Sequence, residues 1–190
     1  MITLIIGGSG SGKSEYAEQV VMELSNGRKR YYIATMQVYD EEGQKKVDRH
    51  RRMRGGKGFE TLECPVDIGN AFVRDDALEE SRQESVALIE CLSNLVANEM
   101  FQPEGICPEE EVVQKIVAGI QKLEQECNSL VIVSNNVFED GVEYDETTMA
   151  YLRAMGKLHQ KLFAYAKRVV EVVVGIPIEI KGESSLCYEC

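Results

Sequence analysis

Short apolar runs recur along the chain, separated by polar or turn-forming residues. Each has the length of a strand and little alternation with polar residues, which indicates strands buried on both faces of a sheet. The runs cover 2–6, 30–35, 85–91, 130–134 and 169–174. Weaker patterns predict a strand at 59–62 and, after the turn Gly175-Ile176-Pro177, a hairpin strand at 178–180 on the sheet edge.

Between the strands, apolar positions recur with helical spacing. In 109–126, Val112, Ile116 and Ile120 fall on one face, and Asp145 is placed to cap a helix that runs to about Lys167. Further helical patterns cover 14–24, 40–54, 67–77 and 94–101. The pattern at 67–77 is weak, and 40–54 has almost no apolar face, as expected of a helix that is exposed or serves a site. The segment 102–108 holds two prolines and a glycine and is predicted to be a loop.

Strands that alternate with helices predict a three-layer α/β fold, with a mostly parallel sheet and an antiparallel edge strand. We expect residues 1–182 to form one domain, because 190 residues with 44% hydrophobic content suit a single core, and 183–190 to form a tail. The net charge of −11 weighs against a general nucleic-acid binder. No run approaches the ~20 apolar residues of a membrane span. The first apolar run is short and lacks a basic leader, so we expect a cytoplasmic protein.

The first strand leads into the most informative motif. Gly7, four further residues and Gly12-Lys13-Ser14 form the phosphate-binding loop pattern between a strand and a helix. Backbone N–H groups of such a loop surround a polyphosphate, while Lys13 can reach the outer phosphates and Ser14 can offer its hydroxyl to Mg²⁺. The predicted loop residues are Gly7, Gly8, Ser9, Gly10, Ser11 and Gly12. A glycine-rich turn that binds nothing is the alternative, but the flanking strand and helix favour a phosphate-loop NTPase fold of the RecA-like type.

The strand at 85–91 carries an acid near its end. In phosphate-loop proteins a strand of this kind places a carboxylate beside the loop, next to the metal ion. We therefore predict that Glu90, together with Ser14, binds Mg²⁺. The alternative is that Glu90 only caps the helix that follows.

A basic segment stands out in this acidic chain. Between 45 and 57, the only acid is Asp48, and His50 lies in the middle. The basic residues are Lys45, Lys46, Arg49, Arg51, Arg52, Arg54 and Lys57. The segment is either a solvated surface, the usual role of a charge run, or a platform for an anionic group, and Gly55-Gly56-Lys57-Gly58 could act as a hinge after it. RNA is a poor candidate for the anion because the net charge is so negative.

Two other features predict little chemistry. Cys187 and Cys190 form a C-x-x-C pair, which without a second pair or a nearby histidine is weak evidence for zinc and favours two free thiols in the tail. His159 lies inside a predicted helix next to polar positions, so we interpret it as a surface or packing histidine.

Several short motifs follow one another in a specific order. They are Tyr32-Ile33-Ala34-Thr35, His50-Arg51 followed by Arg54, Phe59-Glu60-Thr61-Leu62-Glu63, Ile89-Glu90-Cys91-Leu92-Ser93-Asn94-Leu95, Val133-Ser134-Asn135 and Val172-Val173-Val174-Gly175-Ile176-Pro177. With the phosphate loop, this succession resembles the bifunctional adenosylcobinamide kinase / adenosylcobinamide-phosphate guanylyltransferase family of cobalamin biosynthesis. The resemblance runs from residue 1 to about Lys181, and His50-Arg51 is its most specific part.

The resemblance implies two reactions on a corrinoid substrate. A nucleoside triphosphate, ATP or GTP, phosphorylates adenosylcobinamide, and GMP then passes from GTP through a guanylylated histidine to adenosylcobinamide phosphate, giving adenosylcobinamide-GDP. The family's histidine falls on His50, so His50 and Lys13 are the implied catalytic residues. Thr35, Arg51, Arg54 and Glu63 are implied to bind the nucleotide, with Mg²⁺ as cofactor. The resemblance also suggests a homo-oligomer, specifically a homotrimer.

The chain departs from the family in three places. Asn136 and Phe138 stand where the family usually has Glu and Gly, and His159-Gln160 stands where it often has Asn-Gln. The first two bear on metal handling and on the acceptor, and therefore on the kinase step. From the residues, two other classes stay open: a small-molecule kinase in which His50 is only an exposed residue, and a nucleotide-binding regulatory protein without catalysis.

Overall fold

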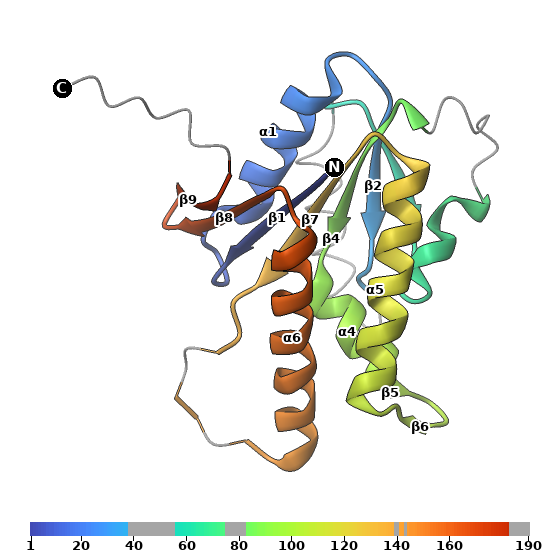
Figure 1. The fold of residues 1–190 in the computed structure, drawn as a ribbon, viewed down its shortest axis with the longest axis vertical. Helices are drawn as coiled ribbons and strands as arrows, with labels where there is room; N and C mark the ends of the chain where they lie inside the picture. Colours follow the sequence, from blue (N-terminus) through green and yellow to red (C-terminus); the bar gives the residue numbers. More distant parts are fainter. Residues whose placement is uncertain (38–55, 75–82, 139–140, 143, 183–190) are drawn as a thin grey trace.

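A seven-stranded sheet forms the centre of the molecule. The computed structural model describes residues 1–37, 56–74, 83–138, 141–142 and 144–182. Across the sheet the strand order is β3-β2-β4-β7-β1-β8-β9 (Figure 1). All neighbours pair in parallel except β9, which runs antiparallel to β8 at the edge. The strands are β1 (Ile2–Gly7), β2 (Arg30–Ala34), β3 (Phe59–Glu63), β4 (Val86–Glu90), β7 (Ser129–Asn135), β8 (Arg168–Val173) and β9 (Ile176–Lys181).

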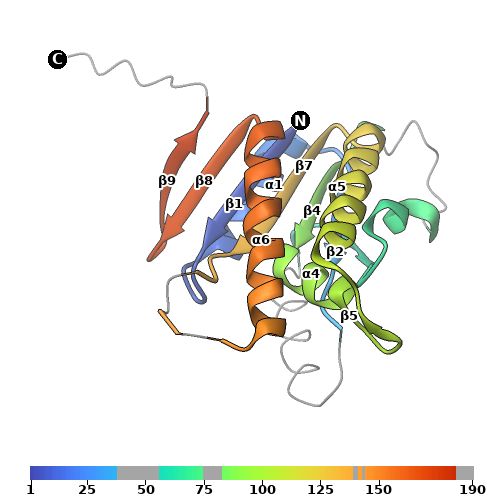
Figure 2. The ribbon, with the colours of Figure 1, turned by 60° about the horizontal axis from the view of Figure 1, so that its bottom comes forward.

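Helices cover both faces of this sheet, which confirms the predicted three-layer α/β fold. Helix α1 (Lys13–Ser25) lies on one face, and α4 (Leu92–Met100), α5 (Glu109–Glu126), α6 (Glu146–Tyr165) and the 3₁₀ helix η1 (Ile68–Arg74) lie on the other. Figure 2 shows α5 and α6 side by side across the sheet, with α1 behind it. A hydrophobic core lies on each face of the sheet, and successive residues of β1 point into different cores. Leu4 packs on the side of α5 and α6, whereas Ile5 packs under α1.

Most predicted elements are confirmed within a few residues, and two differ. The weak helix predicted at 67–77 is the short 3₁₀ helix η1. The prediction of a loop at 102–108 is wrong for the first half of this segment. There, β5 (Phe101–Gln102) and β6 (Gly105–Ile106) pair as a small antiparallel hairpin. The two intervening residues form its turn, so the proline there supports a hairpin rather than an open loop. The helix predicted at 40–54 lies outside the described residues.

The cap predicted at Asp145 is also confirmed. Asp145 caps α6, because its carboxylate accepts hydrogen bonds from the N–H groups of Thr147 (2.9 Å) and Thr148 (3.1 Å). A bond from the Thr148 hydroxyl and these two bonds lower the pKa of Asp145. In the described ranges, every helix is too short or too polar to cross a membrane.

Two glycines inside helices offer a matched test of packing. A Cβ at Gly119 of α5 would lie 2.6 Å from Ile68 Cγ2 and 2.9 Å from the backbone nitrogen of Gly69, whereas a Cβ at Gly156 of α6 would meet no atom closer than 3.9 Å. We therefore expect Gly119→Ala to lower the free energy of unfolding by about 1–3 kcal/mol, because η1 must move away. Gly156→Ala should raise it by up to about 1 kcal/mol through helix propensity. Urea unfolding measures both, and a gain for Gly119→Ala would contradict the close contact.

Candidate active site

The phosphate loop is formed at the carboxyl end of β1. Gly10 (φ +72°) and Gly12 (φ +88°) adopt left-handed conformations, and Gly12 is the N-cap of α1, so the helix N-terminus faces the loop. A Cβ at Gly7 would lie 2.5 Å from Ser11 Oγ and 2.7 Å from the carbonyl oxygen of Val172. Glycine is therefore required at Gly7 by space as well as by motif. The N–H of Gly175 donates to the Ser11 carbonyl at 2.7 Å, so the turn between β8 and β9 braces the loop.

Two polar side chains of the loop are held inside it. Lys13 is only 7% exposed, and its ammonium donates to the carbonyl oxygen of Gly8 at 3.1 Å. The Ser11 hydroxyl is buried and has no hydrogen-bond partner among the described residues. A buried donor without a partner is costly unless a ligand satisfies it. Both groups therefore fit a loop that is built to bind a polyphosphate.

The acid predicted beside the loop is found there. Ser14 Oγ of α1 donates to Glu90 Oε1 at the end of β4 at 2.8 Å, although β7 lies between β4 and β1, the strand that leads into the loop. The contact disfavours the alternative in which Glu90 only caps α4, whose N-cap is Cys91. A hydroxyl and a carboxylate suit Mg²⁺, which takes few protein ligands and leaves positions for water and phosphate. Among the described residues, no group of three or more His, Cys, Asp or Glu side chains offers a metal site.

Thr35 supports the end of β4. It is fully buried, and its hydroxyl accepts from the N–H of Cys91 (2.7 Å) and donates to the Cys91 carbonyl (2.8 Å). Its own N–H donates to the Glu90 carbonyl at 3.0 Å. Thr35 thus fixes the backbone on both sides of the Glu90–Cys91 bond, and a direct contact with nucleotide stays a prediction. Glu63 is exposed at the carboxyl end of β3, and the strands β2, β4 and β7 separate β3 from β1 and its loop.

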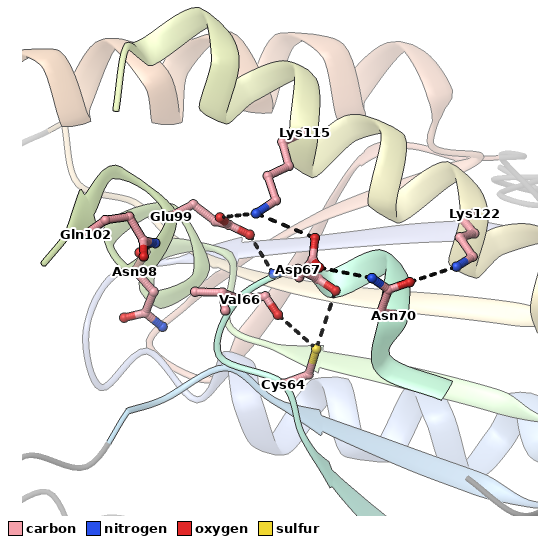
Figure 3. Close-up of polar contacts among 9 residues, drawn as sticks. All are labelled: Cys64, Val66, Asp67, Asn70, Asn98, Glu99, Gln102, Lys115 and Lys122. Carbon is pink, nitrogen blue, oxygen red and sulfur yellow. Dashed lines mark hydrogen bonds and ion pairs between the residues drawn. The ribbon is translucent and has the colours of Figure 1, made fainter. Parts of the chain in front are cut away.

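Helix α4 ties together the segments that follow β2 and β3. The Asn98 amide donates to the carbonyl oxygens of Thr35 (2.7 Å) and Pro65 (2.9 Å). Glu99, 4% exposed, accepts from the N–H of Asp67 (2.6 Å) and from the Lys115 ammonium (2.8 Å), which raises the pKa of Lys115 (Figure 3). Sequence reasoning missed both residues. The available signal was a carboxylate on the apolar face of α4, beside the buried Leu95 and Val96.

Two departures from the family pattern contact each other. A hydrogen bond of 2.7 Å joins His159 Nε2 to the buried Ser134 hydroxyl at the end of β7. The Phe138 ring meets the His159 ring edge to face, with centroids 5.6 Å apart. Burial lowers the pKa of His159 to about 4, so its ring is neutral near pH 7. These contacts fit the interpretation of His159 as a packing histidine.

His159 gives the stability of the protein a pH dependence. Its pKa is about 4 in the fold, whereas an unfolded imidazole has a pKa of about 6.5. The unfolded state therefore binds a proton more readily as the pH falls from about 6.5 to 4, and the free energy of unfolding should decrease by up to about 3 kcal/mol. Urea unfolding across this range should show a smaller decrease for His159→Gln. Equal slopes for parent and variant would assign the effect to other groups.

His50, Arg51 and Arg54 lie outside the described residues. Asn136 lies beside the first residue of the phosphate loop, since its N–H donates to the Gly7 carbonyl at 2.9 Å. Its side-chain oxygen accepts from the N–H of Phe138 at 3.4 Å. The position usually held by a glutamate in the family is therefore adjacent to the phosphate loop.

Comparison with known proteins decides the family. The model of the family described as cobinamide kinase / cobinamide phosphate guanyltransferase matches residues 3–180. The chain belongs to this family. It is 31% identical over 185 residues to the bifunctional adenosylcobalamin biosynthesis protein CobP of Pseudomonas aeruginosa, covering 96% of this chain and 99% of that protein. It is 30% identical over 190 residues to the bifunctional adenosylcobalamin biosynthesis protein CobU of Escherichia coli K12, covering 95% and 100%.

The fold comparison agrees with the sheet. A solved structure of an ATPase domain superposes with a TM-score of 0.50 at 12% identity, covering 90% of this chain and 68% of that one. The likeness concerns the fold alone, and with the formed phosphate loop it confirms the predicted phosphate-loop NTPase architecture. The fold likeness says nothing of the site residues, so their proposed functions rest on the family and not on this comparison.

Proposed function

We propose that this protein phosphorylates adenosylcobinamide and then transfers GMP to the product, giving adenosylcobinamide-GDP. The observation that carries the proposal is the contact between Ser14 and Glu90 beside a fully formed phosphate loop, in a chain whose family is cobinamide kinase / cobinamide phosphate guanyltransferase. A nucleotide site with a carboxylate and a hydroxyl in reach of the phosphates serves both reactions.

In the kinase step, the hydroxyl oxygen of the aminopropanol arm attacks the γ-phosphorus of ATP or GTP. The bond from that phosphorus to the bridging oxygen breaks, the nucleoside diphosphate leaves, and the hydroxyl proton is released. The loop N–H groups and Lys13 hold the negative oxygens. Ser14 and Glu90 would hold Mg²⁺, which when bound supplies positive charge to the phosphates.

In the guanylyl step, an imidazole nitrogen of His50 attacks the α-phosphorus of GTP. A phosphorus–nitrogen bond forms, the bond to the bridging oxygen breaks, pyrophosphate leaves, and the ring loses a proton. A phosphate oxygen of adenosylcobinamide phosphate then attacks the same phosphorus, the phosphorus–nitrogen bond breaks, and the ring regains its proton. Arg51 and Arg54 neutralise the α-phosphate, and Thr35 and Glu63 help to hold the nucleotide. Two displacements on one histidine let one nucleotide site serve a bulky acceptor.

The proposed assembly is a homo-oligomer, specifically a trimer, that uses the edge formed by β8 and β9. Val174 is 86% exposed in the turn, and Ile176, Ile178 and Ile180 are also exposed along β9. An exposed apolar edge strand of this kind favours association with another chain. Sedimentation of the parent and of Ile178→Lys tests the proposal, and a monomeric parent would overturn it.

The intact mass of the protein after incubation with GTP and Mg²⁺ tests the guanylyl step. The expected result is one GMP adduct per chain that is lost in acid, as a phosphoramidate is, and that maps to His50. Phosphorylation of adenosylcobinamide by ATP or GTP tests the kinase step separately. Phosphorylation without an adduct would leave a simple kinase, and GTP binding without either product would leave a regulatory protein.

A further inference from the structure

Asn135 is the last residue of β7, the strand between the one that leads into the phosphate loop and the one that carries the acid. In the sheet, β7 pairs with β1 on one side and with β4 on the other. Asn135 pairs with Gly7, the first residue of the loop. The last residues paired between β4 and β7 are Ile89 and Ile132, so Asn135 lies beyond the end of that pairing. Asn135 is therefore placed between the phosphate loop and the region where β4 ends at Glu90.

The side chain of Asn135 faces the side of the sheet that carries α1. Side chains alternate between the two faces along a strand. On β7, Val133 belongs to the core under α1, and Asn135 continues its row. On β4, Leu88 belongs to the same core, and Glu90 continues its row. The carboxamide of Asn135 therefore faces the same side as the Glu90 carboxylate, which contacts Ser14 beside the loop.

The amide nitrogen of Asn135 is already bonded inside the protein. Nδ2 donates to Ser93 Oγ, in the first turn of α4, at 2.6 Å and lies 3.9 Å from Cys91 Sγ. Ser93 is itself 5% exposed, and its carbonyl oxygen accepts from the Tyr151 hydroxyl at 3.3 Å. Within the part of the chain that the structure describes, Asn135 Oδ1 has no hydrogen-bond partner. The carboxamide is thus fixed through its nitrogen and offers its oxygen, which can only accept a hydrogen bond.

An acceptor at this place restricts which reacting group it can bind. The phosphate oxygens of the nucleotide are negatively charged and carry no proton to donate, and Lys13 with the loop N–H groups binds them. The hydroxyl of the aminopropanol arm does carry a proton, and it must approach the γ-phosphorus from the side opposite the bridging oxygen. Of the groups that react in the kinase step, this hydroxyl is therefore the one that suits Asn135 Oδ1.

We propose that Asn135 is a catalytic residue of the kinase step, which binds the attacking hydroxyl of adenosylcobinamide through Oδ1 while Ser93 holds its carboxamide in place. The inference rests on the proposed kinase activity. The hydroxyl oxygen attacks the γ-phosphorus, the bond from phosphorus to the bridging oxygen breaks, and the nucleoside diphosphate leaves. An amide oxygen is too weakly basic to take the hydroxyl proton, which passes to solvent, so Asn135 contributes orientation. Formation of the GMP adduct involves no hydroxyl and does not need Asn135.

The test compares phosphorylation with two measurements that need only the nucleotide. For Asn135→Ala in the full chain, we expect kcat/KM for adenosylcobinamide phosphorylation to fall at least about tenfold. The dissociation constant of GTP and the rate of GMP adduct formation should stay within about twofold, which also shows that the variant is folded. Ser93→Ala keeps the carboxamide and removes its 2.6 Å partner, so phosphorylation should fall less, by about two- to fivefold.

Asn128→Ala is the matched control, because it removes an asparagine at the other end of the same strand. Asn128 directly precedes β7, and its side-chain oxygen accepts from the Ser129 hydroxyl at 3.1 Å. It lies at the edge of the sheet opposite the phosphate loop, since all three central strands run in the same direction. Neither activity should change in this variant.

Three results would overturn the inference. Unchanged phosphorylation in Asn135→Ala, with an active parent, would leave the proposed function intact and remove Asn135 from it. Equal losses in Asn135→Ala and Ser93→Ala would assign Asn135 to holding α4, and a parallel loss of GTP affinity would place its contact on the nucleotide. If the parent itself does not phosphorylate adenosylcobinamide, the proposed kinase activity fails, and the inference fails with it.

Discussion

Replacement of His50 by Asn is expected to abolish the GMP adduct and to leave the phosphorylation of adenosylcobinamide within about twofold of the parent rate. The amide nitrogen of Asn has its lone pair delocalised and cannot attack phosphorus, whereas neutral imidazole is a good nucleophile near pH 7. The phosphate loop, Lys13 and the Ser14–Glu90 contact are unchanged in this variant. Intact mass with GTP and a phosphorylation assay with adenosylcobinamide measure the two activities.

The chain provides a matched control, because it contains only two histidines. The second, His159, is bonded to Ser134 and packed against Phe138. His159→Asn should therefore keep the adduct. An adduct that persists in His50→Asn and is lost in His159→Asn would identify His159, which lies on α6 beside the carboxyl end of β7, as the nucleophile. That result would require a different mechanism.

Local signals explain how much of the fold could be predicted. The strand β1, the glycine-rich loop and helix α1 follow one another in sequence, so pattern and motif specify them together. The same holds for the Asp145 cap of α6, which depends on residues within one turn. The position of Glu90 beside the loop could be predicted because a strand end fixes the direction of its carboxylate, although the Ser14 contact spans much of the chain.

Contacts between distant segments explain what was missed. Asn98 bonds carbonyl groups on two different loops, and nothing near it in sequence indicates those partners. The hydrogen bond from Asn135 to Ser93 likewise joins a strand end to a helix far along the chain. In the sequence, Phe138 and His159 are separate departures from the family pattern, whereas the structure brings their rings together. Each of these pairings depends on the order of strands in the sheet, which periodicity does not determine.

Replacement of Lys13 by Met is expected to lower both activities by about 10²–10³-fold, because one ammonium serves both reactions. In the kinase step it holds the transferred phosphate, and in the guanylyl step it holds the departing pyrophosphate. Methionine keeps the apolar stem of a side chain that is 7% exposed, so the variant should fold. Thermal unfolding checks that, and the two assays used for His50→Asn measure the loss.

Lys122→Met is the matched control for Lys13→Met. Its ammonium also donates a hydrogen bond, to the side-chain oxygen of Asn70 at 3.0 Å, but it lies on α5, on the opposite face of the sheet from α1. Neither activity should change. The decisive outcome is the relation between the two losses in Lys13→Met. Loss of both activities means that the nucleotide binds in the same phosphate loop for both steps. One lysine can contribute to both reactions only if they share a nucleotide site. Loss of phosphorylation with an intact adduct would require a second nucleotide site for guanylyl transfer and would separate the two reactions in space.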